Sequence, residues 1–359
     1  MTTEAPDIFS KRLRQARAIK GLALRGLADA IGGAVSHTAL AKYEAGQMQP
    51  DSTVLIKLCD ALDQVPDYFF RPFTITLQDV RFRKKASLGV KAEQAVRERA
   101  MEYFERYHEI EQIVDAPSKF PGRLAGPSIK TPEAAEKMAD ELRKEWKLGR
   151  DPLPNVIELI ESHGIKVFEL ANADQDFDGF SAETEAGPVI VLADWLNVNL
   201  LRKRMTAVHE LAHLVLPLAK NLSEKEEEDI VKRFAGALLL PKESFEQTFG
   251  KHRTSLSLGE LIEMKANFGA SIWAIMMRAR QLGLIGEQVF LRFCREANAW
   301  RAQKREPGDD LYRGNESHSR FKQLVHRAVA EECISASKAS SLLGQTIGEF
   351  RKEFREVFS

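Results

Sequence analysis

Cysteine is rare in this sequence, and long apolar runs are absent. Three cysteines, Cys59, Cys294 and Cys333, lie far apart among 359 residues, so neither a disulfide framework nor a paired-cysteine zinc site is expected. No apolar run approaches the roughly 18 residues that a membrane-spanning helix needs. With no apolar leader after Met1, these absences predict a soluble, cytoplasmic protein without a membrane partner.

The sequence has no net charge, because 52 basic residues balance 52 acidic ones. Such a balance hides local asymmetry and neither supports nor excludes a nucleic-acid partner. The composition is that of a globular protein, with 44% hydrophobic and 29% charged residues. A length of 359 residues predicts two or three domains of about 100 to 200 residues each.

Clusters of proline and glycine divide the chain. One cluster lies at 117–127 and another break lies at 306–309. Thr131 and Pro132 make a good helix start just after the first cluster. The predicted segments are a first domain at 1–73, a spacer helix and linker at 74–130, a second domain at 131–300, and a linker with a C-terminal helical module at 301–359.

Periodicity predicts mainly helices with a small β-sheet. Residues 80–114 are rich in helix formers and should form the spacer helix. A strand is expected at 165–170. Residues 177–182 and 188–193 should form a hairpin around 183–187.

The first segment carries a basic amphipathic helix. Between Ile8 and Lys20 the chain has five basic residues and no acidic one. A second helix from Leu24 should end at Gly32, and Ser36 should cap a third helix. Helix, glycine-containing turn and helix is the helix-turn-helix pattern. The five basic residues are Lys11, Arg12, Arg14, Arg17 and Lys20.

The start of the third helix offers contacts for double-stranded DNA. Ser36, His37 and Thr38 would present backbone amides and small polar side chains to phosphates and base edges in a major groove. Lys42 lies one turn further along the same face. The alternative is a small helical bundle whose basic face is only solvated. The coincidence of signals favours a DNA operator as partner.

Several residues of the first segment follow a known family pattern: Arg12-Leu13-Arg14, Leu27-Ala28, Leu40-Ala41-Lys42-Tyr43-Glu44, Gly46 and Pro50. This pattern resembles the phage-repressor (XRE-type) helix-turn-helix family over residues 8–71, with Gly33 and Ala34 as two extra residues in the turn. The resemblance implies an N-terminal five-helix bundle and a homodimer on paired half-sites. The DNA contacts that it implies are His37, Thr38 and Lys42, with Arg25 on a phosphate.

Residues 209–213 read His-Glu-Leu-Ala-His. Two histidines four residues apart lie on one face of a helix and can share a metal ion, while Glu210 can polarise a water beside it. Apolar neighbours predict a buried helix, in which His209, Glu210 and His213 would be costly without a partner. The alternative is that they are core polar groups with other protein partners. The zincin arrangement favours a metal site.

A catalytic zinc site usually has three protein ligands, so a further ligand is expected. An acidic run precedes a helix whose apolar face includes Val231 and Phe234. Helical periodicity places both Glu227 and Glu228 at the edge of that face and Asp229 on the solvent-exposed side of the helix. Spacing alone does not choose between the two glutamates. The other acids suit a helix start, where the helix dipole favours negative charge.

A second family pattern comprises the motif at 209–213, Leu216, the block Phe-Ala-Gly-Ala-Leu-Leu-Leu-Pro at 234–241, Gly179-Phe180 and the run 188–192. Together these features resemble the ImmA/IrrE family of metallopeptidases over residues 131–300. Ala212 and Ile230 stand where that family often has glycine and glutamate. The resemblance implies an α+β zincin-like domain that binds Zn²⁺ through His209, His213 and Glu228, with Glu210 as the catalytic base.

The two resemblances predict a DNA-binding transcriptional regulator with zinc-dependent endopeptidase activity. The expected substrate is a partner repressor or regulatory protein, as in phage or stress-response regulators. Strand 188–193 is a candidate sheet edge on which an extended substrate could add as a further strand. The alternative is a DNA-binding repressor or antitoxin whose zincin-like domain is a non-catalytic sensor or dimerisation module.

Overall fold

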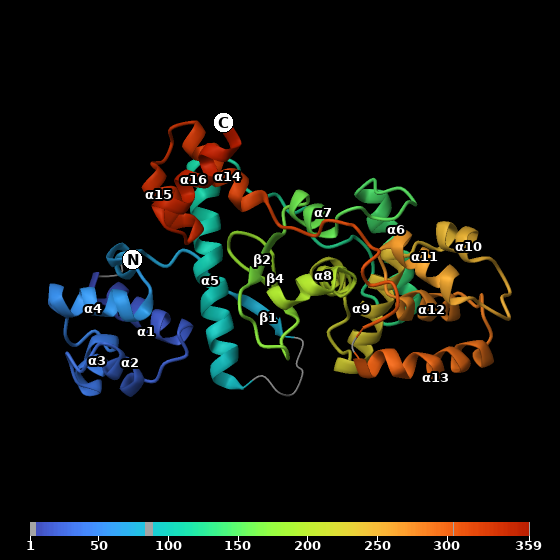
Figure 1. The fold of residues 1–359 in the computed structure, drawn as a ribbon, viewed down its shortest axis with the longest axis horizontal. Coiled ribbons are helices and arrows are strands. Elements are labelled where there is room, and N and C mark those ends of the chain that lie inside the picture. Colours follow the sequence, from blue (N-terminus) through green and yellow to red (C-terminus); the bar gives the residue numbers. More distant parts are fainter. Residues whose placement is uncertain (1–4, 83–88, 304, 359) are drawn as a thin grey trace.

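The fold is organised around one long helix. The computed structural model describes residues 5–82, 89–303 and 305–358. Helix α5 (Val90–Ile113) stands between a small helical N-terminal domain and a sheet backed by further helices (Figure 1). A C-terminal helical module covers one end of α5. The mainly α fold with a small β-sheet is confirmed.

The N-terminal domain is built from helices with local caps. Ser36 accepts a hydrogen bond from the backbone amide of Ala39 at 3.2 Å, as the sequence predicts. Asp51 caps the next helix in the same way. The fifth element is a five-residue 3₁₀ helix, which makes less than about two turns. The elements are α1 (Ala5–Ile19), α2 (Leu24–Ala30), α3 (His37–Glu44), α4 (Ser52–Leu62) and η1 (Pro66–Phe70).

The N-terminal domain is joined to α5 through a buried arginine. Arg12 is only 1% exposed, and its guanidinium lies 2.7 Å from the carboxylate of Glu105 on α5. It also donates to the backbone oxygens of Arg71 and Pro72 and lies over the ring of Phe73. Arg12 is therefore an interface cation, not part of the solvated basic face of α1.

Within the described residues, one sheet has the strand order β1-β3-β4-β2. Strands β3 (Gly179–Glu183) and β4 (Val189–Ala193) form the predicted antiparallel hairpin. Strand β2 (Lys166–Leu170) pairs in parallel with β4. Strand β1 (Gln78–Phe82) comes from far upstream and pairs antiparallel with the outer edge of β3.

Two sequence-based expectations are wrong at this sheet. Residues 80–82 form a strand instead of the start of the spacer helix, and α5 begins only at Val90. Strand β4 is bonded on both sides, to β3 and to β2, so residues 188–193 are not a free edge. The first error arises because β1 pairs with β3, a strand that is distant in sequence, and the second because β2 pairs in parallel with β4. Local periodicity reveals neither pairing.

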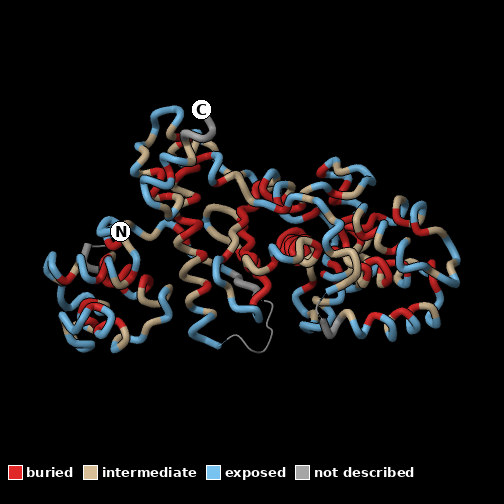
Figure 2. Tube along the Cα trace, viewed as in Figure 1, coloured by how far each residue is buried: buried red, intermediate tan, exposed pale blue. Residues whose placement is uncertain are grey.

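Helix α8 (Leu200–Val215) packs against β3 and β4. It lies on the opposite side of the sheet from α5 (Figure 1). Figure 2 shows that the buried residues concentrate in this sandwich of helix, sheet and helix. The remaining elements here are α6 (Pro132–Glu145), α7 (Val156–Ser162), η2 (Asp194–Val198), α9 (Glu224–Leu239), α10 (Lys242–Phe249), α11 (Leu258–Phe268), α12 (Ile272–Gln281) and α13 (Glu287–Gln303).

The C-terminal module consists of α14 (Arg320–Ala330), α15 (Ala336–Leu343) and α16 (Ile347–Phe358). Its first helix packs on α5. The Arg320 guanidinium lies 2.7 Å from the carboxylate of Glu111, a buried residue of α5. None of the helices in the described residues combines the length and the apolar character that a membrane-spanning segment requires.

Candidate metal centre

Helix α8 carries the two histidines and the glutamate of the predicted site. Asn199 caps the helix by accepting a hydrogen bond from the Arg202 amide at 3.0 Å. His209, Glu210 and His213 are 2%, 0% and 9% exposed. The two imidazole rings lie 5.1 Å apart between centroids. The imidazoles of His209 and His213 and the carboxylate of Glu210 are thus buried together on one helix.

Helix α9 brings Glu228 to these histidines. Potential ligand atoms of His209, His213 and Glu228 all lie within 4.8 Å of one another. His209 Nε2 lies 3.3 Å from Glu228 Oε1. The His209 imidazole, opposed by burial, holds the pKa of Glu228 far below its usual value. The second carboxylate oxygen of Glu228 lies 3.0 Å from Lys232 Nζ.

Glu227, which spacing could not separate from Glu228, occupies a different position. Its Oε1 lies 3.1 Å from His213 Nδ1. Carboxylates in this relation to a metal-ligating histidine fix its tautomer and its ring orientation. Asp229 is exposed on the outer side of α9. Glu226 forms a capping box with Ser223, so this acid serves the helix start.

The residues at this site fit a metal ion. Glu210 Oε1 is buried and makes no hydrogen bond within the described chain, and neither does His209 Nε2. The Oε1 atom of Glu228 lies 3.3 Å from His209 Nε2 without the geometry of a hydrogen bond. Polar atoms buried in this way are costly unless a partner satisfies them. Two imidazoles and one carboxylate are a common ligand set of catalytic zinc, which leaves a further position open. The cluster of His209, His213 and Glu228 therefore has the chemistry of a zinc-binding site.

Two parts of the chain match known families. Residues 13–69 match the family described as helix-turn-helix, and residues 160–280 match the family described as IrrE N-terminal-like domain, a peptidase family. The chain joins these two domains. No curated protein matches it. The IrrE N-terminal-like domain contains α8, α9, β2, β3 and β4, whereas β1 lies upstream of the matched region.

Residues 13–69 are thus a helix-turn-helix domain, which supports a DNA-binding regulator. Four side chains of the predicted DNA surface, Ser36, His37, Thr38 and Lys42, cap or lie on α3, and all are exposed. Arg25 lies in the first turn of α2 and is also exposed. The structure thus leaves all five predicted contacts accessible.

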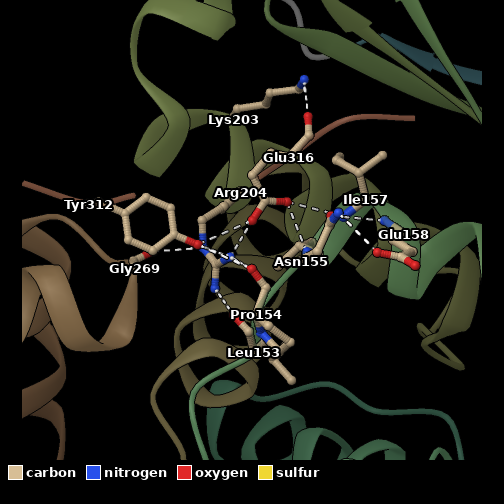
Figure 3. A network of polar contacts seen from close by, with 11 residues as sticks. Leu153, Pro154, Asn155, Ile157, Glu158, Lys203, Arg204, Gly269, Tyr312 and Glu316 are labelled. Atoms are coloured by element: carbon tan, nitrogen blue, oxygen red, sulfur yellow. Dashed lines mark hydrogen bonds and ion pairs between the residues drawn. The ribbon is translucent and has the colours of Figure 1, made fainter. Parts of the chain in front are cut away.

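A buried ion pair anchors α8 within the IrrE N-terminal-like domain, one turn before the histidine motif. The side chains of Arg204 and Glu316 are fully buried and paired with each other. Arg204 also donates to the backbone oxygens of Gly269 and Leu153 at 2.9 and 2.7 Å, and to the Tyr312 hydroxyl at 2.6 Å. Figure 3 shows these partners converging on Arg204.

The same network ties the segment after α13 to the domain. Glu316 Oε2 accepts hydrogen bonds from the amides of Val156 and Ile157 at 2.9 and 3.2 Å, which are the first residues of α7. Lys203 donates to the backbone oxygen of Glu316 (Figure 3). Sequence reasoning missed this network, because Arg204 and Glu316 lie 112 residues apart and neither forms a motif with its neighbours.

Proposed function

We propose that this DNA-binding regulator is also a zinc-dependent endopeptidase that cleaves a partner repressor or regulatory protein. The observation that carries the proposal is the cluster of buried His209 and His213 with half-buried Glu228, beside the buried Glu210. A site that only held a metal for structure would not need a carboxylate with a free oxygen next to it. The match of this domain to a peptidase family supports the same assignment.

The chain's own residues define the steps of such a reaction. His209, His213 and Glu228 would hold the zinc ion, which supplies Lewis-acid polarisation of a peptide carbonyl when bound. Glu210 Oε1, which has no hydrogen-bond partner in the described structure, would accept the proton of the attacking water. The same carboxyl would then return that proton to the leaving amine, so that the amide bond breaks without net consumption of acid or base.

The zinc assignment predicts different outcomes for the two neighbouring glutamates. Glu228→Ala removes a ligand and should abolish stoichiometric zinc binding. Glu227→Ala removes only the carboxylate beside His213 Nδ1 and should weaken zinc affinity by about 10- to 100-fold. Competition with a chromophoric chelator, together with metal analysis of the purified protein, measures both.

An exposed acid on the same helix provides the matched control. Asp229→Ala should leave zinc affinity unchanged, because the Asp229 side chain faces solvent. Equal effects of the Glu227 and Glu228 variants would contradict the ligand assignment. Loss of zinc in the Glu227 variant with retention in the Glu228 variant would reverse it.

We further propose that the protein binds paired operator half-sites as a homodimer, with α3 in the major groove. Arg25→Ala should weaken binding to a similar extent on all DNA sequences. It should also reduce the slope of log K against log salt concentration, the salt slope, by about one. His37→Ala or Thr38→Ala should instead change which sequences are preferred. Electrophoretic mobility shifts at several salt concentrations measure both effects.

Lys57, an exposed cation on α4, is the control for this surface. Lys57→Ala should leave the salt slope and the sequence preference unchanged. If Lys42→Ala and Arg25→Ala behave like this control, the predicted DNA surface is wrong. Sedimentation of the free and DNA-bound protein tests the homodimer directly.

A further inference from the structure

A serine on the sheet contacts the glutamate of the metal motif. Ser181 lies in β3 and is 1% exposed. Its hydroxyl donates a hydrogen bond to Glu210 Oε2 at 3.0 Å. The other oxygen, Glu210 Oε1, has no hydrogen-bond partner among the described residues. The two oxygens of one carboxylate are thus in different situations, one held and one free.

The contact depends on a close approach of β3 to α8. A Cβ atom on Gly179 would lie 2.6 Å from the backbone oxygen of Val191 in β4, so the neighbouring strand requires glycine there. The same Cβ would lie 3.4 Å from Thr206 Cγ2 of α8, which is van der Waals distance and shows that the strand passes directly beside the helix. Residues 179 and 181 share one face of the strand, at a spacing of about 6.6 Å. Thr206 and Glu210 are one helical turn apart, a rise of about 6 Å. The strand therefore runs along the helix with Gly179 at Thr206 and Ser181 at Glu210.

The backbone of Ser181 is fixed on both sides. It is opposite Ile190 of β4 and opposite Arg81 of β1. A hydroxyl that projects from the middle of a paired strand has little freedom to move away. The sheet thus provides a rigid support for one oxygen of Glu210.

We propose that Ser181 is a positioning residue for the peptidase reaction. This role rests on the proposed function. Ser181 holds Glu210 by its Oε2 atom, so that Oε1 is directed to the water whose proton it accepts. Without the hydroxyl, the carboxylate rotates about its terminal torsion, which is a soft coordinate. The general base is then misplaced although the metal ligands are untouched.

Ser181→Ala should therefore lower kcat by about 10- to 100-fold while KM and zinc content stay at wild-type values. Ser181→Thr retains the hydroxyl and should restore most of the activity. The assay uses the zinc-loaded full-length chain and fluorescein-labelled casein as an unfolded protein substrate. Ser340→Ala is the matched control, since Ser340 is a buried serine of the C-terminal module whose hydroxyl donates to Ser337, and its kcat should not change.

A second measurement needs no turnover. In a double-mutant cycle of Ser181→Ala and Glu210→Ala, the unfolding equilibrium constant of the zinc-loaded protein should show a coupling of about tenfold or more, as for hydrogen bonds to charged groups. Additive effects in this cycle, or a wild-type kcat for Ser181→Ala, would overturn the assignment of Ser181. A wild-type protein that binds zinc but cleaves nothing would contradict the proposed function instead, and the cycle would still decide the contact.

Discussion

Glu210→Gln is expected to abolish cleavage of the partner protein while zinc binding and operator binding survive. Glutamine has nearly the same shape as glutamate, but it does not accept a proton at neutral pH. A positioned general base contributes about 10² to 10⁴ in rate, so kcat should fall by at least that factor. The ligands His209, His213 and Glu228 are unchanged, and the predicted DNA surface lies in another domain.

The measurement combines three assays on one preparation. Metal analysis gives zinc content, a mobility shift gives operator affinity, and incubation with candidate repressors encoded near the gene, with and without DNA, gives cleavage. A variant that cleaves, or acts in cells, like the wild type would favour the other interpretation of this domain. In that case the domain is a non-catalytic sensor or dimerisation module.

Glu316→Gln should produce the largest loss of stability among single isosteric changes at the centre of this domain. The carboxylate of Glu316 is fully buried against Arg204, so the variant leaves the guanidinium charge without its counter-charge. Breaking a buried ion pair by removing one partner costs about 3–5 kcal/mol. Glutamine can still accept from the amides of Val156 and Ile157 through its oxygen. Its NH2 group then faces the Arg204 guanidinium, so the variant removes both the counter-charge and one hydrogen-bond acceptor. Denaturant unfolding of the zinc-loaded protein measures the free-energy change.

Two comparisons make this prediction specific. The Glu141 carboxylate lies 3.8 Å from Lys144 Nζ, and the Glu141 side chain is 59% exposed. Glu141→Gln should therefore change the unfolding free energy by no more than about 1 kcal/mol. Adding Arg204→Met to Glu316→Gln should recover part of the loss, because the unpaired buried charge is gone. Additive destabilisation by the two changes would show that the pair is not coupled.

Local signals in the sequence correctly predicted the elements that short-range chemistry specifies. Ser36 caps α3 as expected, since a cap depends only on the next three residues. The hairpin of β3 and β4 also follows from nearby residues. His209 and His213 are neighbours on any helix because they are four residues apart. Forming these features costs little loop-closure entropy, because each depends only on residues that are close together in the sequence.

The tertiary structure decided what depends on contacts between distant segments. Glu227 and Glu228 have nearly equivalent positions in the sequence pattern. Only the packing of α9 on α8 brings Glu228 to both histidines and places Glu227 beside His213 Nδ1. Strand β1, the burial of Arg12 against α5 and the partnership of Ser181 with Glu210 are of the same kind. Each of these contacts joins groups that are tens of residues apart in the sequence. Such a contact stabilises the protein only once the tertiary structure has formed, so no local periodicity in the sequence encodes it.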